Sequence, residues 1–249
     1  ISASFIPPKD IRELRDLNRT RRKLVEEKTR IKNRIEKILQ DSNIKLSSVI
    51  SDIFGKSGLE MITKLTENNR FTEEEILEMA RGQLKKKVAK IRDALEGNLS
   101  ESNTLLLKLH FEHLEFLEDQ IRTIDAEIDR RMEFFRGESE LIQTIPGINN
   151  VSSSAIIAEI GADMSRFPDE KHLSSWAAIC PGNNESAGKK KNGRTRRGNN
   201  YLKGILTECA WAASKTKDTS YSAYYHRMVR KKGKNRALVA LAHKMLIDI

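Results

Sequence analysis

A single hydroxyl stands at the start of a cationic, glycine-punctuated segment. Ser186 is followed by Ala187, Gly188 and three lysines, and seven Lys or Arg residues but no acid lie between Ser186 and Thr207. Cations at this density neutralise phosphate oxygens, and glycine allows the backbone to approach a phosphate closely. A serine hydroxyl beside such a phosphate is a potential nucleophile once its proton is removed. The segment therefore predicts a site that binds a phosphate and can attack it.

The positive charge of the chain is concentrated around this segment. Residues 189–236 contain fifteen basic and two acidic residues, whereas the whole chain of 249 residues has a formal net charge of +10. Localised positive charge is typical of a polyanion partner, since each cation placed on a phosphate releases a condensed counterion. We expect nucleic-acid contacts from Gly188, Lys189, Lys190, Lys191, Arg194, Arg196, Arg197, Asn199, Lys203, Arg230, Lys231 and Lys232.

The overall composition favours a helix-rich protein over a disordered or membrane protein. Charged residues make up 32% of the chain and hydrophobic residues 38%, with only five prolines. No stretch approaches the roughly 18 apolar residues of a membrane helix, and the first residues do not form a signal peptide. Cys180 and Cys209 have no disulfide-framework spacing, which is typical of a reducing cytosol. We expect a cytoplasmic protein with no membrane partner.

Two long helices with heptad spacing are predicted in the first half of the chain. The first begins near Pro8, and the second begins after Ser100, a residue type that caps helix N-termini. Arg21 and Lys28 interrupt the apolar seam of the first helix. The apolar residues that recur every seven positions are Leu17, Leu24, Ile31 and Ile38 in the first helix, and Leu107, Leu114, Ile121, Ile128 and Phe135 in the second. We predict that the two helices pack as an antiparallel coiled-coil stalk that also joins chains into a dimer or tetramer.

The remaining segments complete a mainly α fold in two predicted domains. Residues 44–96 form a helical insertion in the stalk, where Thr72 precedes three glutamates and predicts a helix start. Gly137 ends the stalk, so we expect a stalk domain over residues 1–137 and a small helical domain over residues 138–249.

The second domain begins with a pattern typical of a helix-hairpin-helix. Pro146, Gly147 and Ile148 lie between two segments with helical apolar spacing. In such a motif the backbone N–H groups at the start of the next helix face a DNA phosphate. The alternative is an ordinary helix connection with no nucleic-acid contact.

Other candidate sites carry weaker signals. Five residues rather than four separate Gly182 from Gly188, and Lys190 stands where a nucleotide-binding P-loop requires Ser or Thr, so we do not predict an NTPase. His110 and His113 are close enough to share a metal, but no third ligand has a recognisable spacing, and helix packing is the favoured role. We predict no metal site in this chain.

The aromatic residues leave two interpretations open. Tyr221, Tyr224 and Tyr225 cluster beside a basic stretch, where they either stack on exposed bases or bury their rings on a helix face. Trp176 and Trp211 are predicted to pack in the core.

A series of short motifs resembles a known family. The motifs are Ile145-Pro146-Gly147-Ile148, Ala158-Glu159-Ile160-Gly161-Ala162, Trp176-Ala177-Ala178, Pro181-Gly182, Ser186-Ala187-Gly188-Lys189 and Arg197-Gly198-Asn199-Asn200-Tyr201-Leu202. Together with Ser4-Phe5-Ile6-Pro7-Pro8, they resemble the insertion-sequence transposases that pair a RuvC-like DEDD domain with a serine-bearing carboxy-terminal transposase domain. The resemblance covers nearly the whole chain.

This resemblance implies a DNA recombinase in which Ser186 is the nucleophile. It implies a covalent serine–DNA intermediate and strand exchange directed by a structured guide (bridge) RNA, in a bacterial or archaeal protein acting on the nucleoid. The family's four acidic Mg²⁺ ligands lie in the RuvC-like domain upstream of Ser4. We therefore expect Mg²⁺ in the full-length protein and little activity from this chain alone.

A second function class fits the same charges. A non-catalytic helical scaffold that binds structured RNA or junction DNA needs the cations but not the hydroxyl of Ser186. The two hypotheses therefore differ at that one side chain.

Overall fold

The computed structural model describes residues 7–67, 71–180, 185–186, 189–190, 195 and 198–249. These residues are mainly helical, as predicted, with one short pair of strands. The chain divides into two compact units, one built from residues up to 21 together with 124–249, and one from residues 22–123. The predicted domain boundary at Gly137 falls inside the first unit, because the helix ends that precede it pack into that unit's core.

Two long helices contribute residues to both units. Helix α1 spans Lys9–Asp41 and helix α5 spans Glu101–Met132. The side chain of Ser100 accepts a hydrogen bond from the backbone N–H of Asn103 at 3.2 Å, so the predicted N-cap of α5 is confirmed. Among the described residues, no helix is long and apolar enough to cross a membrane.

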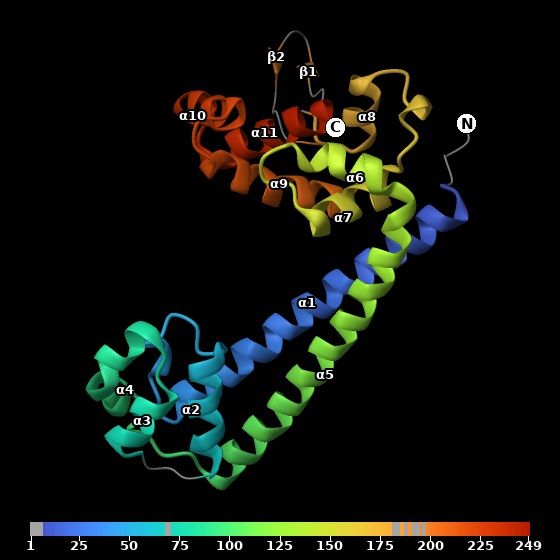
Figure 1. The fold of residues 1–249 in the computed structure, drawn as a ribbon. Coiled ribbons are helices and arrows are strands. Elements are labelled where there is room, and N and C mark those ends of the chain that lie inside the picture. The colour runs from blue at the N-terminus through green and yellow to red at the C-terminus, as the bar shows by residue number, and fades with distance from the viewer. Residues whose placement is uncertain (1–6, 68–70, 181–184, 187–188, 191–194, 196–197) are drawn as a thin grey trace. The chain divides into compact units, whose positions relative to one another are not determined.

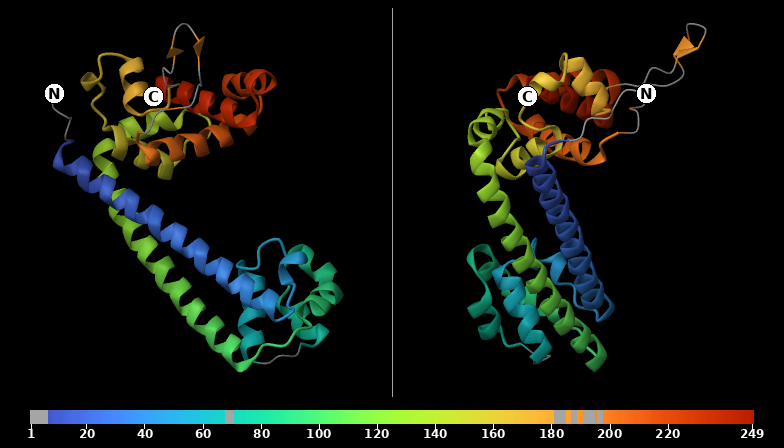
Figure 2. Two further views of the ribbon diagram at one scale, coloured as in Figure 1. Left: turned by 180° about the vertical axis from the view of Figure 1, so that it is seen from behind. Right: turned by 90° about the vertical axis from the view of Figure 1, so that its right-hand side faces the viewer.

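The first unit holds the predicted site segments (Figure 1). Helix α9 packs against both α7 and α11, and α10 packs against α9 and α11 (Figure 2). The elements that follow α5 in this unit are η3 (Glu133–Phe135), α6 (Arg136–Gln143), α7 (Asn150–Ile160), η4 (Met164–Arg166), α8 (Glu170–Trp176), β1 (Glu185–Ser186), β2 (Lys189–Lys190), α9 (Asn200–Lys215), α10 (Ser220–Lys232) and α11 (Lys234–Asp248).

The second unit contains the predicted helical insertion. Its elements between α1 and α5 are η1 (Leu46–Ser48), α2 (Lys56–Glu67), α3 (Glu73–Met79), η2 (Gly82–Lys87) and α4 (Val88–Leu95). Thr72 caps α3 in a capping box with Glu75, which confirms the helix start predicted at Thr72.

Each unit has its own hydrophobic core. In the first unit, Ile11 and Leu14 of α1 and Ile128 and Met132 of α5 are buried with the apolar faces of α7, α9 and α11. In the second, the later residues of α1 pack with the insertion and with the earlier residues of α5. Burial of these apolar faces is the main stabilising contribution to each unit.

Ion pairs join α1 to α5 within each unit. In the first unit Arg21 pairs with Asp125, and Arg131 contacts Glu13 at 2.7 Å. In the second, Lys28 contacts Glu118 at 2.7 Å. Residues later in the sequence of α1 thus pair with residues earlier in the sequence of α5. Both cations that interrupt the heptad seam therefore find acids on the same chain, and they do not need those of a partner. Coiled-coil packing itself stays a prediction.

Candidate phosphate-binding site

Ser186 lies in the first of two short paired strands. Strands β1 and β2 pair antiparallel, with Ser186 opposite Lys189 and Glu185 opposite Lys190. The register therefore brings the backbone of the predicted nucleophile directly opposite that of the first predicted cation. Five of the predicted site residues lie outside the described part of the chain: Gly188, Lys191, Arg194, Arg196 and Arg197.

The described end of this segment is attached to helix α9. The side-chain oxygen of Asn199 accepts hydrogen bonds from the backbone N–H groups of Tyr201 and Leu202, both at 3.1 Å, and caps the helix. Lys203, one turn later, donates a hydrogen bond to the hydroxyl of Thr195. Asn199 and Lys203, both predicted to contact nucleic acid, thus also hold the segment against the helix.

Glu159 of α7 is a buried acid beside this helix start. Its side chain is 3% exposed, and it accepts hydrogen bonds from Arg19 at 2.8 and 2.9 Å and from the amide nitrogen of Asn199 at 2.6 Å. Arg15 donates to the backbone carbonyls of Ala158 and Glu159, both at 2.9 Å. Sequence reasoning assigned Glu159 no role, because only burial and distant partners distinguish it from a surface acid.

The two arginines are electrostatically different although they are one helical turn apart. The hydrogen bond to Glu159 raises the pKa of Arg19, whereas burial lowers the pKa of Arg15. The guanidinium of Arg19 also lies over the ring of Tyr201, 4.5 Å from its centroid. Arg15 and Arg19 thus attach α1 to both α7 and α9.

The predicted hairpin at Pro146 and Gly147 packs against α9. Gly147 has a φ of +89°, and a Cβ atom built there would lie 2.4 Å from the carbonyl oxygen of Cys209. Ile148 is buried in the core, and Asn149 caps α7 by accepting a hydrogen bond from Ser152. The turn thus has a packing role, and its predicted contact with a DNA phosphate stays a prediction.

The third group of predicted residues lies at the end of α10. Arg230, Lys231 and Lys232 form the last turn of this helix, and all three are exposed. Exposed cations on one helical turn can contact a nucleic-acid backbone.

The neighbouring tyrosines pack rather than stand free. Tyr225 is 7% exposed, and Tyr224 packs against the same core. The hydroxyl of Tyr221 donates a hydrogen bond to Asp248 at 2.9 Å, and burial with this contact raises the pKa of Tyr221 to about 12. Of the two interpretations of the cluster, the structure favours burial on a helix face.

The two tryptophans were predicted wrongly as core residues. Trp176 is 43% exposed and Trp211 is 46% exposed. Trp211 lies on the outer face of α9, where Lys215 lies 4.5 Å from its ring centroid. Apolar neighbours in sequence suggested burial, but helical periodicity turns both rings outward.

The described residues contain no group of three or more side chains suited to hold a metal ion. Burial and the nearby Arg34 lower the pKa of His110, and His113 lies 3.9 Å from Glu27. These contacts agree with the packing role favoured for both histidines.

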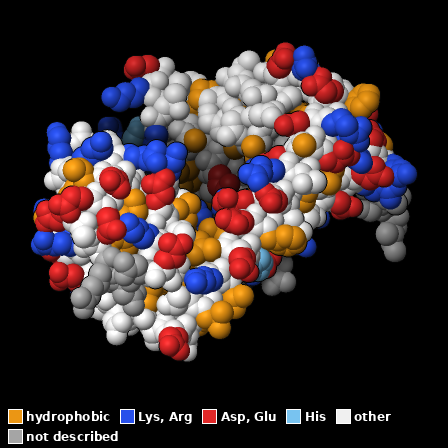
Figure 3. All heavy atoms as spheres, turned by 60° about the horizontal axis from the view of Figure 1, so that its bottom comes forward, with side chains coloured by type: hydrophobic (Ala, Val, Ile, Leu, Met, Phe, Trp, Pro, Cys, Tyr) orange, Lys and Arg blue, Asp and Glu red, His pale blue; other side chains and the backbone are white. Residues whose placement is uncertain are grey.

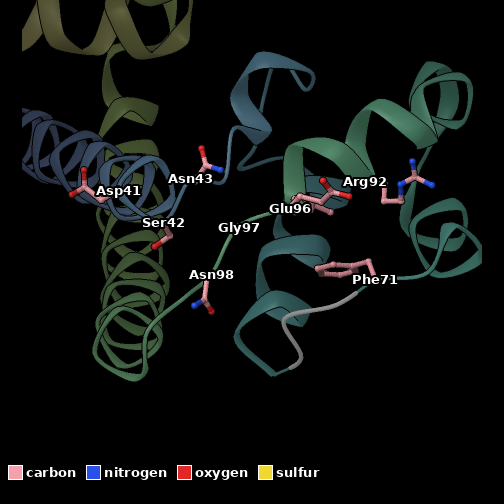
Figure 4. A pocket seen from close by; sticks show the side chains of 9 residues that line it. Asp41, Ser42, Asn43, Phe71, Arg92, Glu96, Gly97 and Asn98 are labelled. Carbon is pink, nitrogen blue, oxygen red and sulfur yellow. The ribbon is translucent and has the colours of Figure 1, made fainter.

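An open hollow lies in the second unit (Figure 4). Its volume is about 720 Å³, and Arg92 at its edge pairs with Glu73 and Asp93. It is lined by Asp41, Ser42, Asn43, Phe71, Arg92, Leu95, Glu96, Gly97 and Asn98. No predicted site residue is among them.

Comparison with known proteins places the similarity on the first unit. Residues 139–226 match the family model described as "Transposase IS116/IS110/IS902 family". This span begins in α6 and ends in α10, so it includes Glu159, Ser186 and Asn199.

Three curated relatives agree with this match. The chain is 30% identical over 111 residues to a transposase for insertion sequence element IS1111A of Coxiella burnetii, covering 43% of this chain and 30% of that protein. It is 30% identical over 134 residues to an uncharacterized 42 kDa protein of insertion element IS900 from Mycobacterium paratuberculosis, covering 52% and 33%. It is 27% identical over 130 residues to an uncharacterized 43.6 kDa protein of IS110 from Streptomyces coelicolor, covering 51% and 31%. The matches thus span about a third of each relative's length.

Proposed function

We propose that this chain is part of a DNA transposase in which Ser186 attacks a DNA phosphodiester. The observation that carries the proposal is the family match over residues 139–226, which includes both Ser186 and the helices that frame its segment. The backbone of Ser186 lies opposite that of Lys189, and we propose Lys189 as one of the cations needed where negative charge develops on the phosphate.

The proposed reaction transfers a phosphoryl group from DNA to the protein. The Ser186 oxygen loses its proton and forms a bond to phosphorus, while the bond from phosphorus to one deoxyribose oxygen breaks. The released oxygen takes up a proton and leaves as a hydroxyl group. The resulting serine–DNA phosphodiester conserves the free energy of the phosphodiester bond that was cleaved. Attack by a DNA hydroxyl reverses the step and joins a new strand.

The cations near Ser186 would bind the DNA backbone and stabilise the transition state. Lys189, Arg194, Arg196 and Arg197 are the residues we propose for this role, and the exposed turn of Arg230, Lys231 and Lys232 would extend the contact. On the face in view in Figure 3, acidic and basic side chains are intermixed, so that face is not a uniformly cationic surface.

Two further partners belong to this proposal through the family resemblance. We propose that a structured guide RNA selects the DNA sites by base pairing, and that the protein contacts the sugar-phosphate backbones of the nucleic acids. We also propose that Mg²⁺ is bound by an acidic domain of the full-length protein. The described residues of this chain offer no cluster for that ion, so we assign none of them to it.

Substitution of Ser186 in the full-length protein tests the proposed chemistry. The Ser186→Ala variant should form no covalent protein–DNA adduct on a supercoiled donor, while its DNA affinity stays within about twofold because phosphate contacts dominate binding. The Ser186→Cys variant should keep a trace of adduct. Ser220→Ala is the matched control, since this exposed serine at the start of α10 should be dispensable.

Peptide mapping of the adduct identifies the residue that is attached to DNA and so distinguishes the ways in which the proposal could be wrong. Attachment at Ser214, Ser220 or Tyr201 would show that a different nucleophile is used. A Ser186→Ala variant that still recombines DNA would exclude Ser186 as the nucleophile. Binding of structured RNA or junction DNA with no adduct in any variant would favour the non-catalytic scaffold.

A further inference from the structure

A second basic segment lies in the second unit, outside the site described above. Residues 79–92 contain six Lys or Arg residues and no acid. Four of the six fall close together, and we call Lys85, Lys86, Lys87 and Lys90 the lysine cluster. All four residues are exposed. Concentrated positive charge is therefore not confined to the first unit.

Most of the cluster has no anionic partner in the fold. Arg81 and Arg92, the other two cations of the segment, are each paired with an acid of α2 or α3. Within the cluster, Lys87 donates a hydrogen bond from its Nζ atom to the backbone carbonyl of Val49 at 3.2 Å. The remaining three lysines form no ion pair with the described residues. Their charges are thus available to an external anion.

The cluster lies at the end of α4 where cations are least favourable. Lys87 is the N-cap of α4 and Lys90 lies in its first turn, while the other two lysines directly precede it in η2. A helix N-terminus carries a partial positive charge and favours acids. Helix α3 follows this rule with a capping box and three glutamates, whereas the first turn of α4 contains no acid. A local rule that is broken without a compensating contact is typical of a functional surface.

The spacing of the cluster fits the phosphates along one strand of a duplex. From Lys85 to Lys90 the chain rises by about 8 Å, at about 2.0 Å per residue in a 3-10 helix and 1.5 Å in an α-helix. Phosphates of one DNA strand follow each other every 3.4 Å or about that distance along the duplex axis. Long, flexible lysine side chains can therefore reach about two or three successive phosphates.

We propose that the lysine cluster is a second DNA-binding surface, which contacts the backbone of a duplex independently of its sequence. DNA is chosen as the polyanion because residues 139–226 match a transposase family, so this choice rests on the proposed function. The surface itself does not depend on the chemistry of Ser186. It gives the second unit, which lies outside the family match, a direct role in holding DNA.

A triple variant measures the contribution of the three unpaired lysines. Lys85→Gln, Lys86→Gln and Lys90→Gln together remove their charges and retain Lys87, which contacts Val49. On a duplex of arbitrary sequence, the slope of log Kd against log salt should fall by about 2 to 3, since each lost phosphate contact is worth about 0.9. The thermal midpoint of the free protein should not fall, because repulsion between neighbouring lysines is relieved.

The control variant removes the same charge from the same unit. Lys37, Lys56 and Lys108 are exposed lysines on three different helices, α1, α2 and α5. Their replacement by glutamine should leave the slope unchanged. An equal fall in the control variant would show an effect of net charge alone and would overturn the proposal, as would an unchanged slope in the cluster variant.

Acetylation of lysines maps the surface in the unsubstituted protein. With the duplex bound, the three unpaired lysines of the cluster should react more slowly than in the free protein, while the three control lysines react equally in both. High salt should abolish the difference, and peptide mass spectrometry measures each site. Protection by a stem-loop RNA but not by the duplex would overturn the assignment to DNA.

The same measurement separates this inference from the binding proposed for the first unit. Protection of Lys231 and Lys232 without the cluster would overturn the second surface and leave DNA binding by α10 in place. Protection of the cluster without those two residues would support the second surface and exclude α10. Protection of neither would overturn both.

Discussion

At the scale of one residue, Gly147 shows how closely the turn at residues 146–148 approaches α9. A Cβ atom there would lie 2.4 Å from the carbonyl oxygen of Cys209 and 2.8 Å from the backbone nitrogen of Ala213, and the φ of +89° disfavours any L side chain. We expect Gly147→Ala to lower the free energy of unfolding by about 2 to 4 kcal/mol, through overpacking and backbone strain together. Urea denaturation monitored by circular dichroism measures this change.

Gly137 provides the matched control for that measurement. It lies in α6, and a Cβ atom there would meet nothing within 4 Å. Gly137→Ala should therefore change the free energy of unfolding by less than about 1 kcal/mol, with a gain expected from the better helix former. Equal effects of the two substitutions would contradict the close packing of the hairpin.

At the scale of an element, the segment between β2 and α9 and the last turn of α10 are two separate candidates for backbone contact. Replacing Arg194, Arg196 and Arg197 by alanine should reduce the slope of log Kd against log salt by up to about 0.9 for each lost phosphate contact. Fluorescence anisotropy on duplexes of unrelated sequence measures the slope. It should be nearly independent of sequence, since phosphate contacts carry none.

The control for this triple variant has the same change in charge. Arg122, Arg130 and Arg136 are each paired with an acid three residues away on the same helical stretch. Their replacement by alanine should leave the salt slope unchanged. A slope that falls only when Arg230, Lys231 and Lys232 are replaced would move the binding surface to α10.

At the scale of the whole molecule, the predicted association of chains needs a different basis from the one the sequence suggested. Arg21 and Lys28 already have acidic partners within the chain. A better candidate surface is the α5 stripe, which we define as Leu105, Leu109 and Phe116 on one helical face, exposed by 58%, 51% and 57%. The dimer predicted from the sequence would bury an apolar surface such as this one.

Light scattering tests this association directly. We expect a mass twice the 28.4 kDa of the chain at high micromolar concentration, reduced to that of a monomer by Leu105→Lys with Phe116→Lys. Leu141→Lys, a substitution at a leucine of α6 that is 68% exposed, is the control. A wild-type chain that stays monomeric at this concentration would exclude the dimer.

The mainly helical class and several helix starts could be predicted from the sequence, because periodicity and capping are local properties. Ser100 and Thr72 were identified as caps from their immediate neighbours alone, and both cap their helices. The position of Ser186 in a cationic segment was equally evident, since residue type and charge density can be read directly from the sequence.

Contacts between residues far apart in the chain could not be predicted and became visible in the folded structure. The partners of Glu159 lie 140 residues before it and 40 residues after it, at Arg19 and Asn199. No local pattern encodes such a contact, because it depends on how three helices pack. The same reason explains the exposed Trp176 and Trp211, whose apolar neighbours indicated burial although their helical faces turn outward. The sequence thus specified the elements and the chemical groups, and packing selected the few polar contacts that join α1, α7 and the start of α9.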